Sequence, residues 1–182
     1  MKPEVTDTSL PTGEALRGRE TDVFNALVER YSMRIYHHLR RMTGSHNDAD
    51  DLVQETYIRV WKALPEFRGD SEWFTWIYRI ATNLCLSFLE KQRRMPLVEF
   101  ESSHANGSVY SDELDSEAVL KRLNEAIALL PEKQRAVFCM RYFDEMSYEQ
   151  LSAVTSTSVG ALKASYHHAV KKLEDYLTHP RS

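Results

Sequence analysis

Residues 147–173, SYEQLSAVTSTSVGALKASYHHAVKKL, decide the fold of the C-terminal part of the chain. In the second half of this stretch apolar residues recur every three or four positions, which predicts an α-helix with one buried face. A shorter helix should precede it, because Ser147 and Gln150 have the spacing of a capping box, and Ser158 is a preferred N-cap for the second helix. Two helices joined so closely predict a helix-turn-helix. The expected buried stripe of the second helix is Val159, Leu162, Tyr166, Ala169, Leu173 and Tyr176.

The opposite face of this second helix is small near its start and polar or cationic further on. A helix that enters the DNA major groove needs small residues for close approach, polar side chains for base edges and cations for phosphates. An ordinary helical hairpin with solvated lysines is the alternative. The candidate DNA-contacting residues on or beside this face are Ser158, Gly160, Ala161, Lys163, Ala164, Ser165, His167, His168, Lys171 and Lys172.

Three further helices are predicted in the N-terminal half, and their apolar stripes predict a compact bundle. The first runs from about Thr21 to near Gly44, a helix-ending residue. The second begins after Ser45 and is closed by Pro65. The third begins near Ser71 and stops before Pro96. Their expected buried residues are Phe24, Leu27, Val28, Tyr31, Ile35, Leu39 and Met42, then Leu52, Val53, Tyr57, Val60 and Leu64, then Ile77, Ile80, Ala81, Leu84 and Phe88.

The composition is that of an all-α protein. The chain has 182 residues, of which 42% are hydrophobic, and little strand-like alternation. It contains neither an apolar run of the ~20 residues that a membrane span needs nor the apolar stretch of a signal peptide, so we expect a cytoplasmic protein. Cys85 and Cys139 both fall within helical patterns, where small core residues with free thiols are expected rather than a metal pair.

Charge is unevenly distributed along the chain. The formal net charge is -4, yet residues 96–117 carry six acidic and no basic side chains. This stretch is too polar to fold alone. We therefore expect a mobile tail over 1–19, a helical domain over 20–95, a flexible acidic linker over 96–115 and a second helical domain over 116–182. Without the acidic stretch the remaining charge is only slightly positive, which predicts weak binding to free DNA and a need for a partner.

Four stretches resemble one family. Residues 48–61 (DADDLVQETYIRVW), 67–70 (FRGD) and 74–83 (FTWIYRIATN) are similar to region 2 of sigma-70-type transcription initiation factors. Residues 130–135 (LPEKQR) and the helix-turn-helix are similar to region 4, and the pattern as a whole resembles the extracytoplasmic-function (ECF) group. This chain departs from the family pattern in two places: Ser156 occupies a turn position where glycine is usual, and Ser165 a position that is often arginine.

The resemblance assigns functions to both domains. It implies that the outer face of the second helix docks on core RNA polymerase, although such charges alone would more often be solvated surface. It also implies that the third helix and the loop before it recognise and melt the minus-ten element, and that the helix-turn-helix reads the minus-thirty-five element. The implied polymerase-binding residues are Asp48, Asp51, Gln54, Glu55, Arg59 and Trp61. The implied minus-ten residues are Arg68, Gly69, Asp70, Ser71, Trp76, Arg79, Asn83, Lys91, Arg93 and Arg94.

Physical chemistry supports the minus-ten assignment in part. Aromatic faces interleaved with cations hold unstacked single-stranded bases, and Trp76 shares a helical face with Arg79 and Asn83. Trp73 and Phe74 have the alternative role of core residues.

The expected partners are core RNA polymerase, promoter DNA and, by resemblance, an anti-sigma factor. Neither a small-molecule substrate nor a cofactor is expected, since the sequence carries no phosphate loop or nucleophile elbow. The pairs His37-His38 and His167-His168 are poor metal chelates, because neighbours on a helix do not share a face. An enzyme is therefore not expected. The alternative function is a stand-alone helix-turn-helix regulator, which would explain only the C-terminal domain.

Overall fold

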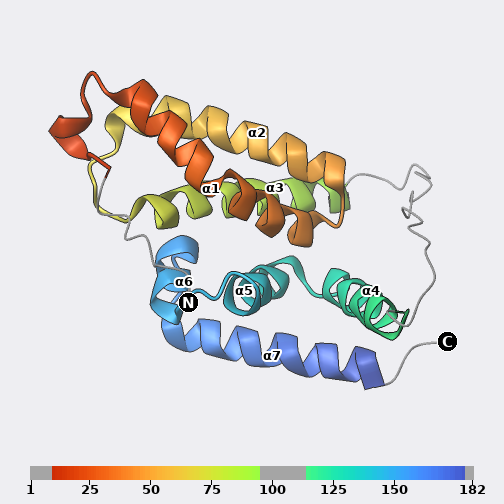
Figure 1. Ribbon diagram of the computed structural model, residues 1–182. Coiled ribbons are helices and arrows are strands. Elements are labelled where there is room, and N and C mark those ends of the chain that lie inside the picture. The colour runs from red at the N-terminus through yellow and green to blue at the C-terminus, as the bar shows by residue number, and fades with distance from the viewer. Residues whose placement is uncertain (1–9, 95–113, 179–182) are drawn as a thin grey trace.

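The computed structural model describes residues 10–94 and 114–178, and in these residues every regular element is helical. Two layers lie against one another (Figure 1). One holds α1 (Glu20–Thr43), α2 (His46–Ala63) and α3 (Trp73–Arg94), and the other holds α4 (Leu114–Ala128), α5 (Glu132–Tyr142), α6 (Tyr148–Thr155) and α7 (Val159–Thr178). None of the helices in the described ranges combines the length and the apolar character that crossing a membrane would take. The all-α prediction is confirmed.

The ends of the N-terminal helices follow the predicted local signals. Gly44 terminates α1 with φ 75° and donates its backbone N–H to Arg40 O at 3.0 Å. The next helix starts at once, because Ser45 Oγ accepts the backbone N–H of Asp48 at 3.3 Å. Pro65 lies in the short 3₁₀ helix η3 (Leu64–Glu66) that ends α2. Cap chemistry therefore determines where the chain reverses.

The core of the bundle is rich in aromatic residues. Trp73 is 2% exposed and Tyr78 is fully buried, and Phe67 stacks on Trp73 with ring centroids 3.9 Å apart. Most of the predicted stripe is buried, while Phe24, Val28, Val53, Ile80 and Phe88 are half-buried against it. Burial of large rings contributes most to a small helical core.

The C-terminal domain contains the predicted helix-turn-helix. Ser147 Oγ accepts the N–H of Gln150 at 3.2 Å, and Gln150 Oε1 accepts the N–H of Ser147 at 2.9 Å, which completes the capping box before α6. Ser158 Oγ accepts the N–H of Ala161 at 3.3 Å at the start of α7. The turn forms with serine in the glycine position, since Ser156 adopts a left-handed φ of 54°. That conformation costs a non-glycine residue roughly 1–2 kcal/mol.

One expectation about the N-terminus is wrong where the structure describes it. We expected a mobile tail over 1–19, but Gly13–Leu16 form the 3₁₀ helix η2. Leu16 is 2% exposed in the core of the bundle. A single apolar anchor among prolines and glycines has no periodicity, so the sequence pattern did not reveal this packing.

The two domains are in contact, which the sequence did not predict. Arg135 of α5 donates from Nη1 to the carbonyl oxygen of Met42 at 2.6 Å, at the C-terminal end of α1. Asp144, just after α5, accepts from Arg41 Nη1 at 3.1 Å and lies 3.0 Å from Nδ1 of the fully buried His38. Nearly all of the expected linker 96–115 lies outside the described residues.

Candidate functional site

The outer face of α2 presents charged and apolar side chains together. Asp51 and Gln54 are exposed, and Glu55 pairs with Arg59 at 2.8 Å one turn along the helix. Asp48 is half-buried. Trp61 is 45% exposed and packs edge-on against Phe24. The six predicted polymerase-binding residues thus lie on one helix, five of them along its solvent side and Asp48 at its capped start.

Ile58 belongs to this face and was absent from the predicted set. Its side chain is 47% exposed between charged neighbours. Ile58 and Trp61 lie one turn apart, and adjacent exposed apolar residues rimmed by charges are typical of a protein-binding surface. Its spacing from Glu55 and Lys62 already places Ile58 on the outer face of the helix, although it was not assigned a binding role.

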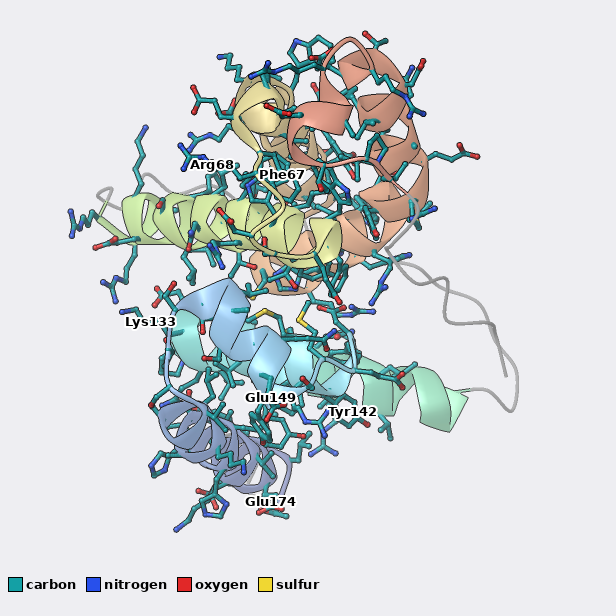
Figure 2. All side chains as sticks on the ribbon, turned by 90° about the vertical axis from the view of Figure 1, so that its left-hand side faces the viewer. Phe67, Arg68, Lys133, Tyr142, Glu149 and Glu174 are labelled. Carbon is teal, nitrogen blue, oxygen red and sulfur yellow. The ribbon has the colours of Figure 1, made fainter. Side chains whose placement is uncertain are left out.

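The loop between α2 and α3 borders a cavity of about 720 Å³. Phe67 and Arg68, labelled in Figure 2, begin this loop on the N-terminal bundle. Phe67 is buried, whereas Arg68 and Asp70 are exposed and Ser71 is half-buried at the rim. The cavity is lined by Gly13, Glu14, Arg17, Ala63, Pro65, Glu66, Phe67, Arg68, Asp70, Ser71, Trp76 and Arg79.

Aromatic rings form one side of this cavity. Trp76 is half-buried, with its ring centroid 4.8 Å from that of Phe67 and 5.7 Å from that of Trp73. Trp73 and Phe74 are core residues, as their alternative role predicted. Of Trp73, Phe74 and Trp76, only Trp76 lines the cavity. Its ring is therefore the candidate on which a base could stack.

Further along α3, some of the predicted minus-ten residues are exposed to solvent and others contact the C-terminal domain. Asn83 is exposed. Arg79 donates from Nε to the carbonyl oxygen of Ala153 in α6 at 3.0 Å, so the C-terminal domain occupies its guanidinium. Arg93 lies 3.9 Å from Glu132 of α5, and Arg94 pairs with Glu90 of its own helix. Part of the predicted minus-ten surface therefore faces the second domain.

The predicted outer face of α7 is exposed. Ser158, Gly160, Ala161, Lys163, Ala164, His167, His168 and Lys171 are all exposed, and Ser165 is half-buried. Leu162, Ala169 and Leu173 are buried on the opposite side, as the stripe predicted. Lys172 differs, because its Nζ donates to Gln134 Oε1 at 3.0 Å on α5. Small residues at the helix start and cations beyond them are the arrangement that a major-groove helix requires.

Two buried thiols, Cys85 of α3 and Cys139 of α5, lie near Arg135 where the domains meet. Burial raises the pKa of the Cys85 and Cys139 thiols to about 12, an effect that the positive charge of Arg135 partly offsets. Burial also lowers the pKa of the Arg135 guanidinium. From the sequence, His38 was considered only as a poor metal ligand. In the structure its ring is buried between Asp144 and Thr82, and its Nε2 lies 3.2 Å from Thr82 Oγ1. No sequence period signals such a contact between distant segments.

Comparison with known proteins agrees with this geometry. Residues 27–95 match the family model for sigma-70 region 2, and residues 120–173 match the one for sigma-70 region 4. The ECF RNA polymerase sigma-E factors of Salmonella typhimurium and Escherichia coli are each 31% identical to this chain over 96% of its length and 96% of theirs. The Haemophilus influenzae sigma-E factor is 29% identical over 96% of this chain and 97% of its own.

Solved structures show the same fold. The sigma factor RpoE of Bartonella quintana, in complex with the anti-sigma factor NepR, has a TM-score of 0.68 at 21% identity over 87% of this chain and 98% of its own. CnrH, in complex with the cytosolic domain of CnrY, has a TM-score of 0.66 at 23% identity over 88% of this chain and 91% of its own. The matches to region 2 and region 4 occur in the family's order and fall on the helices where the sequence predicted them. The chain belongs to the extracytoplasmic-function group of sigma-70-type sigma factors.

Proposed function

We propose that this sigma factor joins core RNA polymerase through the outer face of α2 and directs it to promoters read at two elements. The observation that carries the proposal is the presence of two distinct surfaces in one chain. One is the mixed apolar and charged face of α2, where Ile58 and Trp61 are about half exposed. The other is the exposed outer face of α7. A stand-alone regulator would need only the second surface.

The polymerase-binding surface consists of Asp48, Asp51, Gln54, Glu55, Ile58, Arg59 and Trp61. Ile58 and Trp61 supply apolar area that gains from burial against a partner, and the surrounding charges supply complementarity and orientation. Acidic residues on this helix suit a basic partner surface.

The minus-ten surface combines the cavity beside 67–71 with the exposed side of α3. Trp76 stacks an unpaired base, Asn83 provides hydrogen bonds, and Lys91, Arg93 and Arg94 at the end of the helix contact phosphates. Arg68, Gly69, Asp70 and Ser71 form the rim at which a base turned out of the duplex enters. Each stacked base contributes roughly 1–3 kcal/mol.

The minus-thirty-five surface is the outer face of α7. Gly160, Ala161 and Ala164 permit close approach to the major groove, and Lys163, His167 and Lys171 reach base edges or phosphates. Ser165 and His168 flank this face, and Ser158 caps it. Lys172 contacts DNA only if it leaves Gln134.

Promoter recognition requires the two domains to separate. Arg79 cannot reach DNA while it donates to Ala153 O, and Arg93 is close to Glu132. Binding of promoter DNA would favour the separated state, because only that state exposes the whole minus-ten surface. A second ligand that prefers the closed state would inhibit, and we propose an anti-sigma factor in this role, since the B. quintana neighbour is bound to one.

Run-off transcription with purified core polymerase tests the proposal. Transcripts should start at one position only when the sigma factor is added. Reversing charge with Asp51→Lys and Glu55→Lys should abolish both co-purification with core polymerase and specific starts, whereas Glu174→Lys with Asp175→Lys, two exposed residues of α7, should leave both intact. Specific DNA binding as a symmetric dimer, with no effect on polymerase, would instead identify a stand-alone regulator.

Promoter opening has its own test. Permanganate footprinting should lose the melted region after Trp76→Ala combined with Asn83→Ala, while binding to core polymerase persists. Normal opening by this double variant would overturn the assignment of the minus-ten surface.

A further inference from the structure

The cavity beside the loop 67–71 has a wall that the proposed function leaves unused. Three of its lining residues, Gly13, Glu14 and Arg17, belong to the N-terminal segment before α1. This segment precedes the part of the chain that matches the region 2 model, which begins at residue 27. The cavity volume of about 720 Å³ lies within the range of small-ligand sites.

The segment is held firmly enough to form a wall. Leu16 is 2% exposed in the bundle core, and its carbonyl oxygen accepts the backbone N–H of Arg19 at 2.9 Å. At its other end the segment meets Gly69 closely, because a Cβ placed on Gly69 would lie 2.9 Å from Thr12 Oγ1. Gly69 also has φ 84°, which favours glycine. Segment and loop are therefore fitted to one another.

The side chains on this wall can recognise a nucleotide. The Glu14 carboxylate only accepts hydrogen bonds, whereas the Arg17 guanidinium only donates them. A carboxylate pairs with the exocyclic amino group of adenine, cytosine or guanine, whereas thymine has no such group. Guanidinium groups bind phosphate oxygens in a bidentate manner. Trp76 lines the same cavity and offers a ring face.

We propose that Glu14 and Arg17 are binding residues for the nucleotide held in this cavity. Glu14 selects a base with an exocyclic amino group, and Arg17 contacts the phosphate of the same nucleotide. The N-terminal segment thereby contributes to base preference at one position of the minus-ten element. This inference rests on the proposed function, because it takes the cavity to be where the unpaired base is held.

Competitive transcription from a promoter library randomised through the minus-ten element tests this role. The holoenzyme with Glu14→Ala should lose, by roughly fivefold or more, its preference for bases with an exocyclic amino group (adenine, cytosine or guanine) over thymine at one position. Arg17→Ala should weaken transcription from all sequences similarly and leave the preference unchanged. Glu29→Ala and Arg19→Ala, which change exposed residues that do not line the cavity, are the matched controls and should behave as wild type.

Two further measurements distinguish a failure of the roles proposed for Glu14 and Arg17 from a failure of the minus-ten assignment. Thermal melting should show that Glu14→Ala and Arg17→Ala fold like wild type, because both side chains are exposed. If Trp76→Ala with Asn83→Ala abolishes promoter opening but Glu14→Ala keeps the full base preference, the wall has no role in selection and the proposed function stands. If opening survives the Trp76 and Asn83 changes as well, the minus-ten assignment itself fails.

Discussion

The N-terminal bundle and the C-terminal domain are two small helical domains that are stabilised in different ways. In the bundle, three long helices bury Trp73, Tyr78 and other rings almost completely. In the C-terminal domain, α5 and α6 are short, and Phe138 is the only aromatic residue buried among those described. Large rings stabilise the first domain from within, whereas the second also uses contacts from Arg135 and Asp144 to the bundle. We infer that the bundle is the more autonomous unit.

The largest effect should follow from damage to the bundle core. Trp73→Ala should lower the free energy of unfolding by about 3–5 kcal/mol, because a large cavity replaces a buried ring. Urea unfolding followed by circular dichroism measures this change. The half-exposed Trp61 provides the comparison, and Trp61→Ala should cost less than about 1 kcal/mol. A loss as small as that of Trp61→Ala would show that the core does not depend on Trp73.

An intermediate effect should follow from breaking the contact between the domains. Asp144→Asn replaces an acceptor by an amide whose nitrogen repels the donors of Arg41 and His38, and should cost about 2 kcal/mol. Small-angle X-ray scattering should show a larger radius of gyration, while the helical content stays unchanged. Glu145→Gln, at the exposed neighbouring residue, should alter neither.

Thiol labelling provides a second measurement of the contact between the two domains. With pKa values of about 12, Cys85 and Cys139 carry little thiolate at pH 8 and should react roughly a thousandfold more slowly than free cysteine with a pKa near 8.5. Separation of the domains should remove much of the burial of Cys139 and accelerate its reaction in Asp144→Asn. Unchanged labelling in a variant with an enlarged radius would mean that Cys139 is buried within its own domain.

The smallest effect should come from the turn of the helix-turn-helix, and it should be stabilising. Ser156→Gly removes the strain of a left-handed φ and should raise the free energy of unfolding by about 0.5–1 kcal/mol, the gain being limited by the entropy of glycine in the unfolded chain. Ser152→Gly, inside α6, should instead destabilise by about 0.5 kcal/mol. Thermal unfolding of the two variants decides the sign, and stabilisation by both would contradict this account.

Local signals in the sequence predicted local structure. The helix limits at Gly44, Ser45 and Ser147 follow from cap chemistry, and the buried side of α7 follows from its period. The candidate faces of α2 and α7 were predicted by the same means, because a period assigns one side of a helix to the core and the other to solvent. DNA binding by the α7 face was predicted from its residue pattern, whereas polymerase binding by the α2 face was implied by family resemblance.

Contacts between distant segments could not be predicted in this way. Periodicity states that a face is buried, but not against what, so the pairing of His38 with Asp144 and the placement of Arg79 against α6 were not foreseen. Leu16 shows the same limit, since one apolar residue without a repeat gives no pattern. Such contacts depend on three-dimensional complementarity rather than on spacing along the chain.

Arg135 affects how the contact between the two domains responds to ionic strength. Its guanidinium donates across the contact to the uncharged carbonyl oxygen of Met42, and within its own domain to those of Ala128 and Leu130. Ionic strength screens the attraction between opposite charges but has little effect on hydrogen bonds to neutral acceptors. Added salt should therefore weaken the partly exposed pair of Asp144 with Arg41 more than the hydrogen bond from Arg135 to Met42. A molecule that separates the domains has to offer Arg135 an acceptor that replaces the carbonyl oxygen of Met42.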